Sequence, residues 1–190
     1  MKLKYETITK ENIRTAAKTQ YNIFPNSSAY AKYLSDIQIA EDLPINYLVY
    51  HRNNLIGVVG LYFIEEYPDT IWLSWFGVLK KYRFKGYGSQ ILKDMIERAK
   101  KYNKKFLRLF TYEVWNSEAQ EFYKKNMQIS EYYTNKKDDQ YDIIEGKCKI
   151  FGYSLCEEKI GYWNNKFINI GADDKIHKKS ILLMKRDNII

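Results

Sequence analysis

The sequence predicts a single α/β domain of the α+β kind over residues 1–190, with a mixed central sheet of about six to seven strands and about four flanking helices. Residues 45–78 hold three β-rich runs separated by turn signals, which favours an antiparallel meander in the N-terminal half. A helical stripe then separates two apolar runs, which indicates a crossover between parallel strands. Beyond residue 129, short β-rich segments with glycine breaks predict a C-terminal extension.

The first half is expected to fold into one strand, two helices and the meander. Residues 4–9 alternate weakly between apolar and polar side chains, as a first strand does. An apolar face from Ile13 to Phe24 predicts a helix that Pro25 breaks, and the spacing from Tyr30 to Ile37 predicts a shorter helix. The meander strands are expected at 45–50, 55–64 and 71–78, with a hairpin turn at 52–54.

The second half holds the clearest helix of the chain, which begins near Gly88 and ends near Ala99. A strand at 106–110 and a helix at 117–125 follow it. We expect residues 4–133 to form the core and to be completed by a terminal strand at 178–186, centred on the apolar run Ser180-Ile181-Leu182-Leu183-Met184. Residues 134–177 are then an insertion or extension without an assigned role.

Charge and cysteine content narrow the class of protein. The net charge of +8 would favour a nucleic acid, an anionic membrane or a phosphate-rich ligand, but the lysines are spread along the chain, as on a solvated surface. Cys148 and Cys156 are too few for a disulfide scaffold and lack the spacing of a zinc site, so we expect unpaired thiols and no metal. With no leader and no apolar run of membrane-spanning length, the sequence predicts a cytoplasmic protein without a membrane partner.

The segment from Val78 to Ser89 is typical of a phosphate-binding turn. It joins a predicted strand to a predicted helix, and Gly86 and Gly88 let the backbone approach a ligand at the start of the helix, where N–H groups are unpaired. An ordinary glycine-containing turn would explain the glycines alone. Four basic residues in the same loop favour an anion site instead; they are Lys80, Lys81, Arg83 and Lys85.

The helix at 117–125 carries a second pattern. At 100° per residue, Asn116, Ala119 and Tyr123 fall on one face, which offers an amide, a small residue and a phenol along about 10 Å. A surface helix that buries only Phe122 would explain the same residues. The position of the pattern after the turn, a helix and a strand favours the functional interpretation.

Together these segments resemble two motifs of the GNAT superfamily of N-acetyltransferases. Arg83-x-x-Gly86-x-Gly88, preceded by Val78, resembles motif A, and Asn116-x-x-Ala119-x-x-Phe122-Tyr123 resembles motif B. The resemblance covers residues 4 to about 133; it departs after the tyrosine, where Asn126-Met127-Gln128 stands in place of the Gly-Phe of many relatives. It implies the GNAT fold, acetyl-CoA as co-substrate and a small-molecule or peptide amine as acceptor.

The resemblance also implies roles for individual residues. The backbone of residues 83–89 would hold the diphosphate, the strand around Phe76 to Val78 would pair with the pantetheine arm, and Asn116 would contact that arm. Tyr123 would be the catalytic acid that protonates the departing thiolate, and backbone N–H groups near Val78 would stabilise the oxyanion. The implied cofactor-binding residues are Phe76, Val78, Arg83, Phe84, Lys85, Gly86, Tyr87, Gly88, Ser89, Asn116 and Ala119.

The sequence leaves the general base and several alternatives open. Glu65, Glu66 and Glu113 are candidate bases only because they lie near strand ends, and a water chain could serve instead. His51 and His177 have no partner in the sequence pattern and are expected on the surface. A GNAT-like domain that binds acyl-CoA without catalysis remains an alternative, as does a homodimer. A basic nucleic-acid-binding module is disfavoured because it leaves the turn at 78–89 unexplained.

Overall fold

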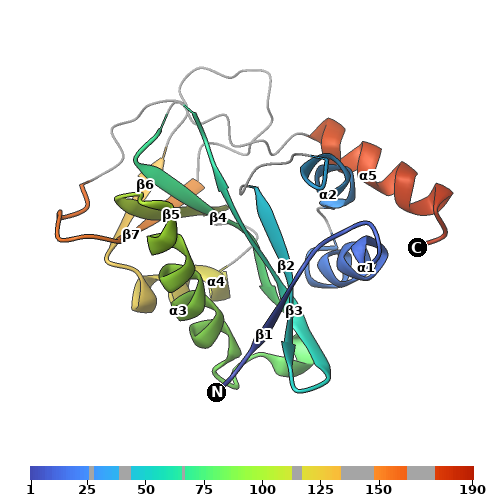
Figure 1. Ribbon diagram of the computed structural model, residues 1–190, viewed down its shortest axis with the longest axis horizontal. Coiled ribbons are helices and arrows are strands. Elements are labelled where there is room, and N and C mark those ends of the chain that lie inside the picture. Colours follow the sequence, from blue (N-terminus) through green and yellow to red (C-terminus); the bar gives the residue numbers. More distant parts are fainter. Residues whose placement is uncertain (26–27, 39–43, 66, 113–116, 134–147, 162–173) are drawn as a thin grey trace. The chain divides into compact units, whose positions relative to one another are not determined.

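The computed structural model describes residues 1–25, 28–38, 44–65, 67–112, 117–133, 148–161 and 174–190. The chain divides into two compact units, one made of Met1–Phe63, Leu73–Met95 and Gly171–Ile190, the other of Ile64–Trp72 and Ile96–Ile170. Seven strands are described in the order β1-β2-β3-β4-β5-β7-β6, and β4 contributes residues to both units (Figure 1). The mixed α/β fold predicted from the sequence is confirmed.

The first unit contains the N-terminal meander. β1 (Lys4–Thr7) pairs antiparallel with β2 (Ile45–His51), β2 pairs antiparallel with β3 (Asn54–Phe63), and β3 neighbours β4 (Thr70–Val78). Their inward side chains are β-branched and aliphatic, and Leu48, Val58 and Ile56 are fully buried. A Cβ atom on Gly57 would lie 2.1 Å from the Gly77 carbonyl oxygen, so glycine is required where β3 passes Gly77 of β4.

Helices complete this unit. α1 (Ile13–Ile23) ends before Pro25, and α2 (Tyr30–Asp36) follows, as the spacing of their apolar residues predicts. α3 (Tyr87–Ala99) begins in this unit after the short 3-10 helix η1 (Lys80–Tyr82) and ends in the other. The buried core joins the apolar faces of α1 and α2 to β2 and β3.

The predicted terminal strand at 178–186 is wrong, because these residues belong to the helix α5 (Asp174–Arg186). Figure 1 shows α5 beside α1 and α2. Ser180 and Met184, four residues apart, are fully buried, whereas Leu182 between them is 69% exposed. Burial at i and i+4 is the helical period, and a short apolar run alone does not distinguish a helix from a strand.

The second unit contains the crossover and the last strands. Residues Thr70–Trp72 of β4 pair parallel with β5 (Phe106–Tyr112), as predicted for two strands joined through a helix. β5 pairs antiparallel with β7 (Cys148–Ser154), which pairs antiparallel with β6 (Ile129–Tyr133). α4 (Ser117–Asn126) and the 3-10 helix η2 (Lys100–Tyr102) belong to the same unit.

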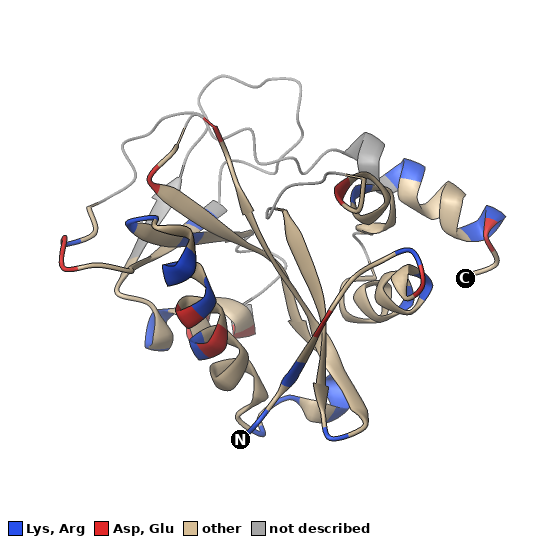
Figure 2. Cartoon of the chain, in the orientation of Figure 1, with Lys and Arg blue, Asp and Glu red and all other residues tan. Residues whose placement is uncertain are grey.

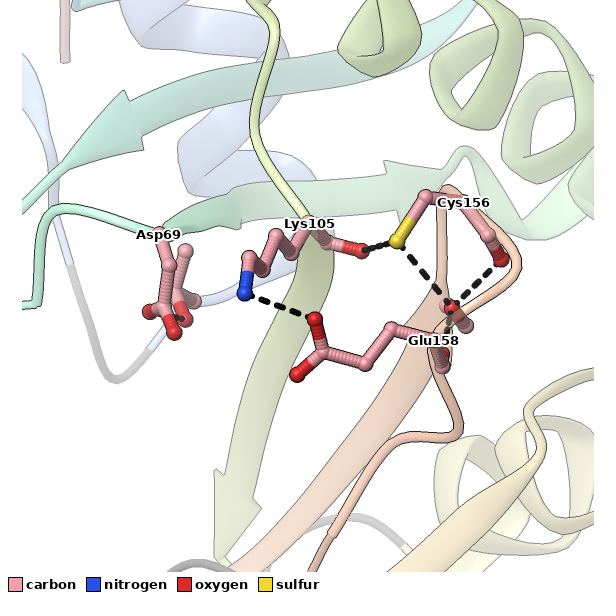
Figure 3. Close-up of polar contacts among 6 residues, drawn as sticks. Asp69, Lys105, Cys156 and Glu158 are labelled. Carbon is pink, nitrogen blue, oxygen red and sulfur yellow. Dashed lines mark hydrogen bonds and ion pairs between the residues drawn. The ribbon is translucent and has the colours of Figure 1, made fainter.

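A turn after β7 is fastened to the start of β5 by polar contacts (Figure 3). Lys105 Nζ lies 2.6 Å from Glu158 Oε2, and the Cys156 thiol lies 3.8 Å from the Lys105 carbonyl oxygen. The Glu158 carboxylate raises the pKa of Lys105. Cys156 is an exposed, free thiol, in agreement with the prediction for this residue, and the side chain of Cys148 lies outside the described residues.

Candidate active site

The turn between β4 and α3 is held in place by its own backbone and by one arginine. After Val78 the Leu79 N–H donates to the Ile56 carbonyl at 2.9 Å, which ties the turn to β3. The Arg83 N–H donates to the Lys80 carbonyl at 3.2 Å, and Arg83 Nε donates to the Val78 carbonyl at 3.1 Å. The arginine side chain therefore ties the middle of the loop to the end of β4.

Two residues of this turn adopt left-handed backbone conformations. Phe84 has φ +60° and Gly86 has φ +82°. Phe84 is 91% exposed, and a Cβ atom added to Gly86 would have no atom within 4 Å. The left-handed conformation is unfavourable for phenylalanine and is accessible to glycine, so Gly86 supplies both the bend and an open space above the backbone.

The amides of this turn have no hydrogen-bond partner in the part of the chain that the structure describes. Among the described residues, none of the backbone N–H groups from Phe84 to Ser89 donates a hydrogen bond. The first helical bond of α3 runs from the Gln90 N–H to the Gly86 carbonyl at 3.1 Å. Successive unbonded N–H groups at a helix start, with left-handed residues among them, are donors of the kind that bind an anion.

Basic side chains lie in this turn, but they also occur on other parts of the chain. Lys80, Lys81 and Lys85 are exposed and Arg83 is half-buried. Figure 2 shows that lysines and arginines also lie on other helices and strands of both units. The basic residues of the turn gain significance from the unbonded amides beside them, and not from the overall charge.

His51, which is expected on the surface and has no partner visible in the sequence pattern, lies half-buried against this turn. Its Nδ1 lies 2.9 Å from the hydroxyl of Tyr87, the first residue of α3, and both side chains are half-buried. The two rings lie 5.4 Å apart, and the Tyr87 ring also packs edge-on against Tyr82 at 5.8 Å. No local pattern reveals this contact, because His51 and Tyr87 are 36 residues apart.

The strand before the turn carries a distortion that the sequence does not predict. Trp75, inside β4, has φ +46°, a left-handed conformation that interrupts the pleat. Its ring packs edge-on against Phe24 at the end of α1, 6.2 Å away. Phe76 and Val78, two of the predicted binding residues, follow this distortion. Within its unit β4 is the last strand of the sheet.

The second predicted motif lies on α4. Tyr123 is 7% exposed, and its ring centroid lies 5.3 Å from those of Phe151 and Phe122. Burial raises the pKa of Tyr123, so the phenol is protonated at neutral pH but is a weaker acid than a solvent-exposed tyrosine. Ala119 is half-buried one turn earlier on α4, and Asn116 lies outside the described residues.

The candidate bases gain no support from the structure. Glu65 is exposed, whereas Glu66 and Glu113 lie outside the described residues. His177 belongs to α5, and its side chain is likewise not described. Within the described ranges, no group of three His, Cys, Asp or Glu side chains could hold a metal ion. No helix in the same ranges is long and apolar enough to cross a bilayer.

Comparison with solved structures supports the fold. A ribosomal-protein-S18-alanine N-acetyltransferase from Escherichia coli is 13% identical, with a TM-score of 0.59 over 88% of this chain and 100% of that one. A spermidine/spermine N-acetyltransferase from Vibrio cholerae is 14% identical, with a TM-score of 0.60 over 80% and 92%. A GNAT family acetyltransferase from Elizabethkingia anophelis with acetyl-CoA bound is 20% identical, with a TM-score of 0.56 over 80% and 97%.

Comparison of the sequence supports the family. No curated protein matches this chain. The family model described as "Acetyltransferase (GNAT) family" matches residues 11–127, which include the turn after β4 and all of α4. Because this match spans more than half of the sequence, the chain belongs to the GNAT acetyltransferase family.

Proposed function

We propose that this protein transfers an acetyl group from acetyl-CoA to an amine of a small-molecule or peptide acceptor. The observation that carries the proposal is the row of unbonded amides from Phe84 to Ser89 at the start of α3. A diphosphate is an anion of suitable size for such a row, and the open space above Gly86 leaves room for it. The residues present therefore fit the cofactor that the family uses.

Each predicted binding residue has a defined part in this proposal. The amides of residues 84–89 bind the diphosphate, while Lys80, Lys81 and Lys85 add positive charge around it. Arg83 holds the loop closed through Val78. The backbone of Phe76 to Val78 pairs with the amide groups of the pantetheine arm, and Ala119 leaves space on α4 for that arm. Asn116 would contact the pantetheine arm, as the resemblance to motif B implies.

The chemistry is a direct transfer. Acetyl-CoA supplies a thioester whose carbonyl carbon is electrophilic. The neutral amine forms a bond to that carbon, the carbon–sulfur bond breaks, and the amine loses a proton to water. Tyr123 gives its phenolic proton to the departing sulfur, and a backbone N–H near Val78 stabilises the developing oxyanion. The Tyr123 phenolate then takes a proton from water, which balances the proton that the amine released and returns the enzyme to its starting state.

The amine class of acceptor agrees with the named substrates of the neighbours. One acts on the alanine of ribosomal protein S18 and another on spermidine or spermine, and all of these present amines. The cytoplasmic location and the homodimer stay predictions.

The test measures thiol release from acetyl-CoA with a panel of polyamines, aminoglycosides, amino acids and peptide N-termini. With an accepted amine, Tyr123→Phe should lower kcat by about 10²-fold or more, because the loss of a positioned acid removes general acid catalysis. Tyr153→Phe is the matched control, since Tyr153 is a half-buried tyrosine on β7 without a proposed role. Unchanged turnover of Tyr123→Phe across pH would refute the assignment of the acid.

Cofactor binding is tested separately by calorimetric titration with CoA. Gly86→Asp should abolish binding, because its carboxylate would enter the diphosphate site and repel it. Gly161→Asp introduces the same charge at another exposed, open glycine and should bind CoA normally. Binding without turnover would establish the non-catalytic alternative. Salt-sensitive retention on heparin without any response to CoA would favour the nucleic-acid alternative and refute the proposal.

A further inference from the structure

The contact between His51 and Tyr87 joins the β2–β3 hairpin to the first residue of α3. His51 is the last residue of β2, and its partner across the hairpin is Asn54 of β3. Its Nδ1 lies 2.9 Å from the Tyr87 hydroxyl, which is a well-formed hydrogen bond. The hairpin is part of a sheet whose strands are buried at Leu48 and Val58, so His51 is attached to a rigid element.

Tyr87 is placed where a side-chain contact can set the position of the unbonded amides. It stands between Gly86 and Gly88, and these two neighbours have no side chains with which to fasten the backbone. Ser89, the next residue, is exposed. The hydrogen bond to His51 and the edge-on contact with Tyr82 are therefore the side-chain contacts that hold the Gly-Tyr-Gly segment among the described residues.

We propose that His51 is a positioning residue that fixes the diphosphate-binding amides of the turn through its hydrogen bond to Tyr87. The inference rests on the proposed function and names a residue that acts on the cofactor through another side chain. A ligand site loses affinity when its groups shift by a fraction of an ångström, and a second layer of hydrogen bonds prevents such shifts. His51 supplies this second layer from the sheet.

The chain offers a control contact of the same kind. The Tyr5 hydroxyl on β1 donates to Asp94 Oδ2 on α3 at 2.7 Å. Both contacts join a strand of the meander to α3, but Asp94 lies seven residues beyond Tyr87, which is about 10 Å along the helix. If His51 only attached α3 to the sheet, removing either contact should have the same effect. If His51 positions the turn, only removal of the His51 contact should weaken cofactor binding.

The experiment compares acetyl-CoA kinetics and CoA binding for His51→Ala, His51→Asn, Tyr87→Phe and Tyr5→Phe. We expect His51→Ala to raise the KM for acetyl-CoA and the Kd for CoA by about tenfold, with kcat at saturating acetyl-CoA within about twofold of wild type. The amide of His51→Asn occupies the place of Nδ1 and should restore most of the affinity. Tyr87→Phe should match His51→Ala, and the double variant should be no worse than either single variant.

The control and the contrary outcomes separate this inference from the proposed function. Tyr5→Phe should lower the melting temperature but leave KM and Kd unchanged. If the wild-type protein does not bind CoA, the proposed function and this inference both fail. If the wild type binds CoA and His51→Ala binds it equally well, or loses kcat instead of affinity, only the inference fails. Should His51→Ala not fold, the Tyr87→Phe variant decides the question.

Discussion

Two tyrosines on α2 illustrate how differently one residue type contributes to stability. Tyr33 is 1% exposed, and its hydroxyl makes no hydrogen bond with any described residue. Tyr30, one turn earlier, places its hydroxyl 2.8 Å from Asp187 Oδ2. A buried hydroxyl without a partner costs about 1–3 kcal/mol, whereas a satisfied one contributes about 1 kcal/mol. The two hydroxyl groups should therefore affect folding with opposite sign.

We expect Tyr33→Phe to raise the free energy of unfolding by about 1 kcal/mol, because it removes the unpaired hydroxyl and keeps the ring. Tyr30→Phe should lower the free energy of unfolding by about 1 kcal/mol, because it removes the bond to Asp187. Urea denaturation of the two variants and the wild type gives both values. A loss of stability in Tyr33→Phe would mean that its hydroxyl is satisfied in solution.

At the scale of elements, α2 depends on α5. With seven residues, α2 is too short to be stable alone. α5 supplies a hydrogen-bond acceptor for the first turn of α2. The Ala31 N–H, one of the donors that has no partner within the helix, donates to the Ser180 hydroxyl at 2.9 Å. Met184 adds a fully buried side chain whose sulfur lies 3.1 Å from the Ser28 hydroxyl.

Met184→Ala should lower the free energy of unfolding by about 2–5 kcal/mol, because it leaves a cavity in the contact between the two helices. Leu182→Ala is the matched control, since Leu182 lies on the same helix but is 69% exposed, and its effect should stay within about 0.5 kcal/mol. Denaturant unfolding measures both variants, and hydrogen exchange of the α2 amides localises the effect. Equal losses in the two variants would contradict the docking of α5 described by the structure.

At the scale of the whole molecule, each compact unit contains a tyrosine whose pKa is raised by burial. Tyr33 belongs to the first unit and Tyr123 to the second. Desolvation raises the pKa of both phenols, and a nearby Asp36 raises that of Tyr33 further. Both phenols therefore keep their protons in the folded chain at pH values where the unfolded chain, with a tyrosine pKa of about 10, releases them.

The sign of the pH dependence follows from this difference. Below about pH 10 both states are protonated and stability does not depend on these groups. Above it the folded state binds more protons, so the free energy of unfolding should fall by about 1.4 kcal/mol per pH unit for each buried tyrosine. Urea denaturation at pH 8.5 and pH 11 measures the loss. The double variant Tyr33→Phe/Tyr123→Phe should lose markedly less, and an equal loss would exclude these phenols as the cause.

Much of the fold could be predicted because its signals are local. The meander, the order of helices and the parallel pairing of β4 with β5 follow from alternation, from helical spacing and from the rule for crossover connections. The strand predicted at 178–186 failed, because an apolar run such as 180–184 fits either period until a partner surface selects one. In this protein α5 packs against α2, and this contact favours the helical period, in which Ser180 and Met184 are both buried.

The candidate site also contains parts that the sequence predicted and parts that it did not. Gly86 and Gly88, together with the four basic residues of the same loop, predicted the anion-binding turn, because backbone freedom and charge are properties of the residue type. The contact of His51 with Tyr87 and the left-handed Trp75 had no signal in the sequence. Both depend on packing between segments that are distant along the chain. The sequence by itself determined most of the strands and helices and predicted an anion-binding turn, because these signals are local. Only the tertiary structure decided that residues 178–186 are helical and which side chains contact that turn, because both depend on packing between distant segments.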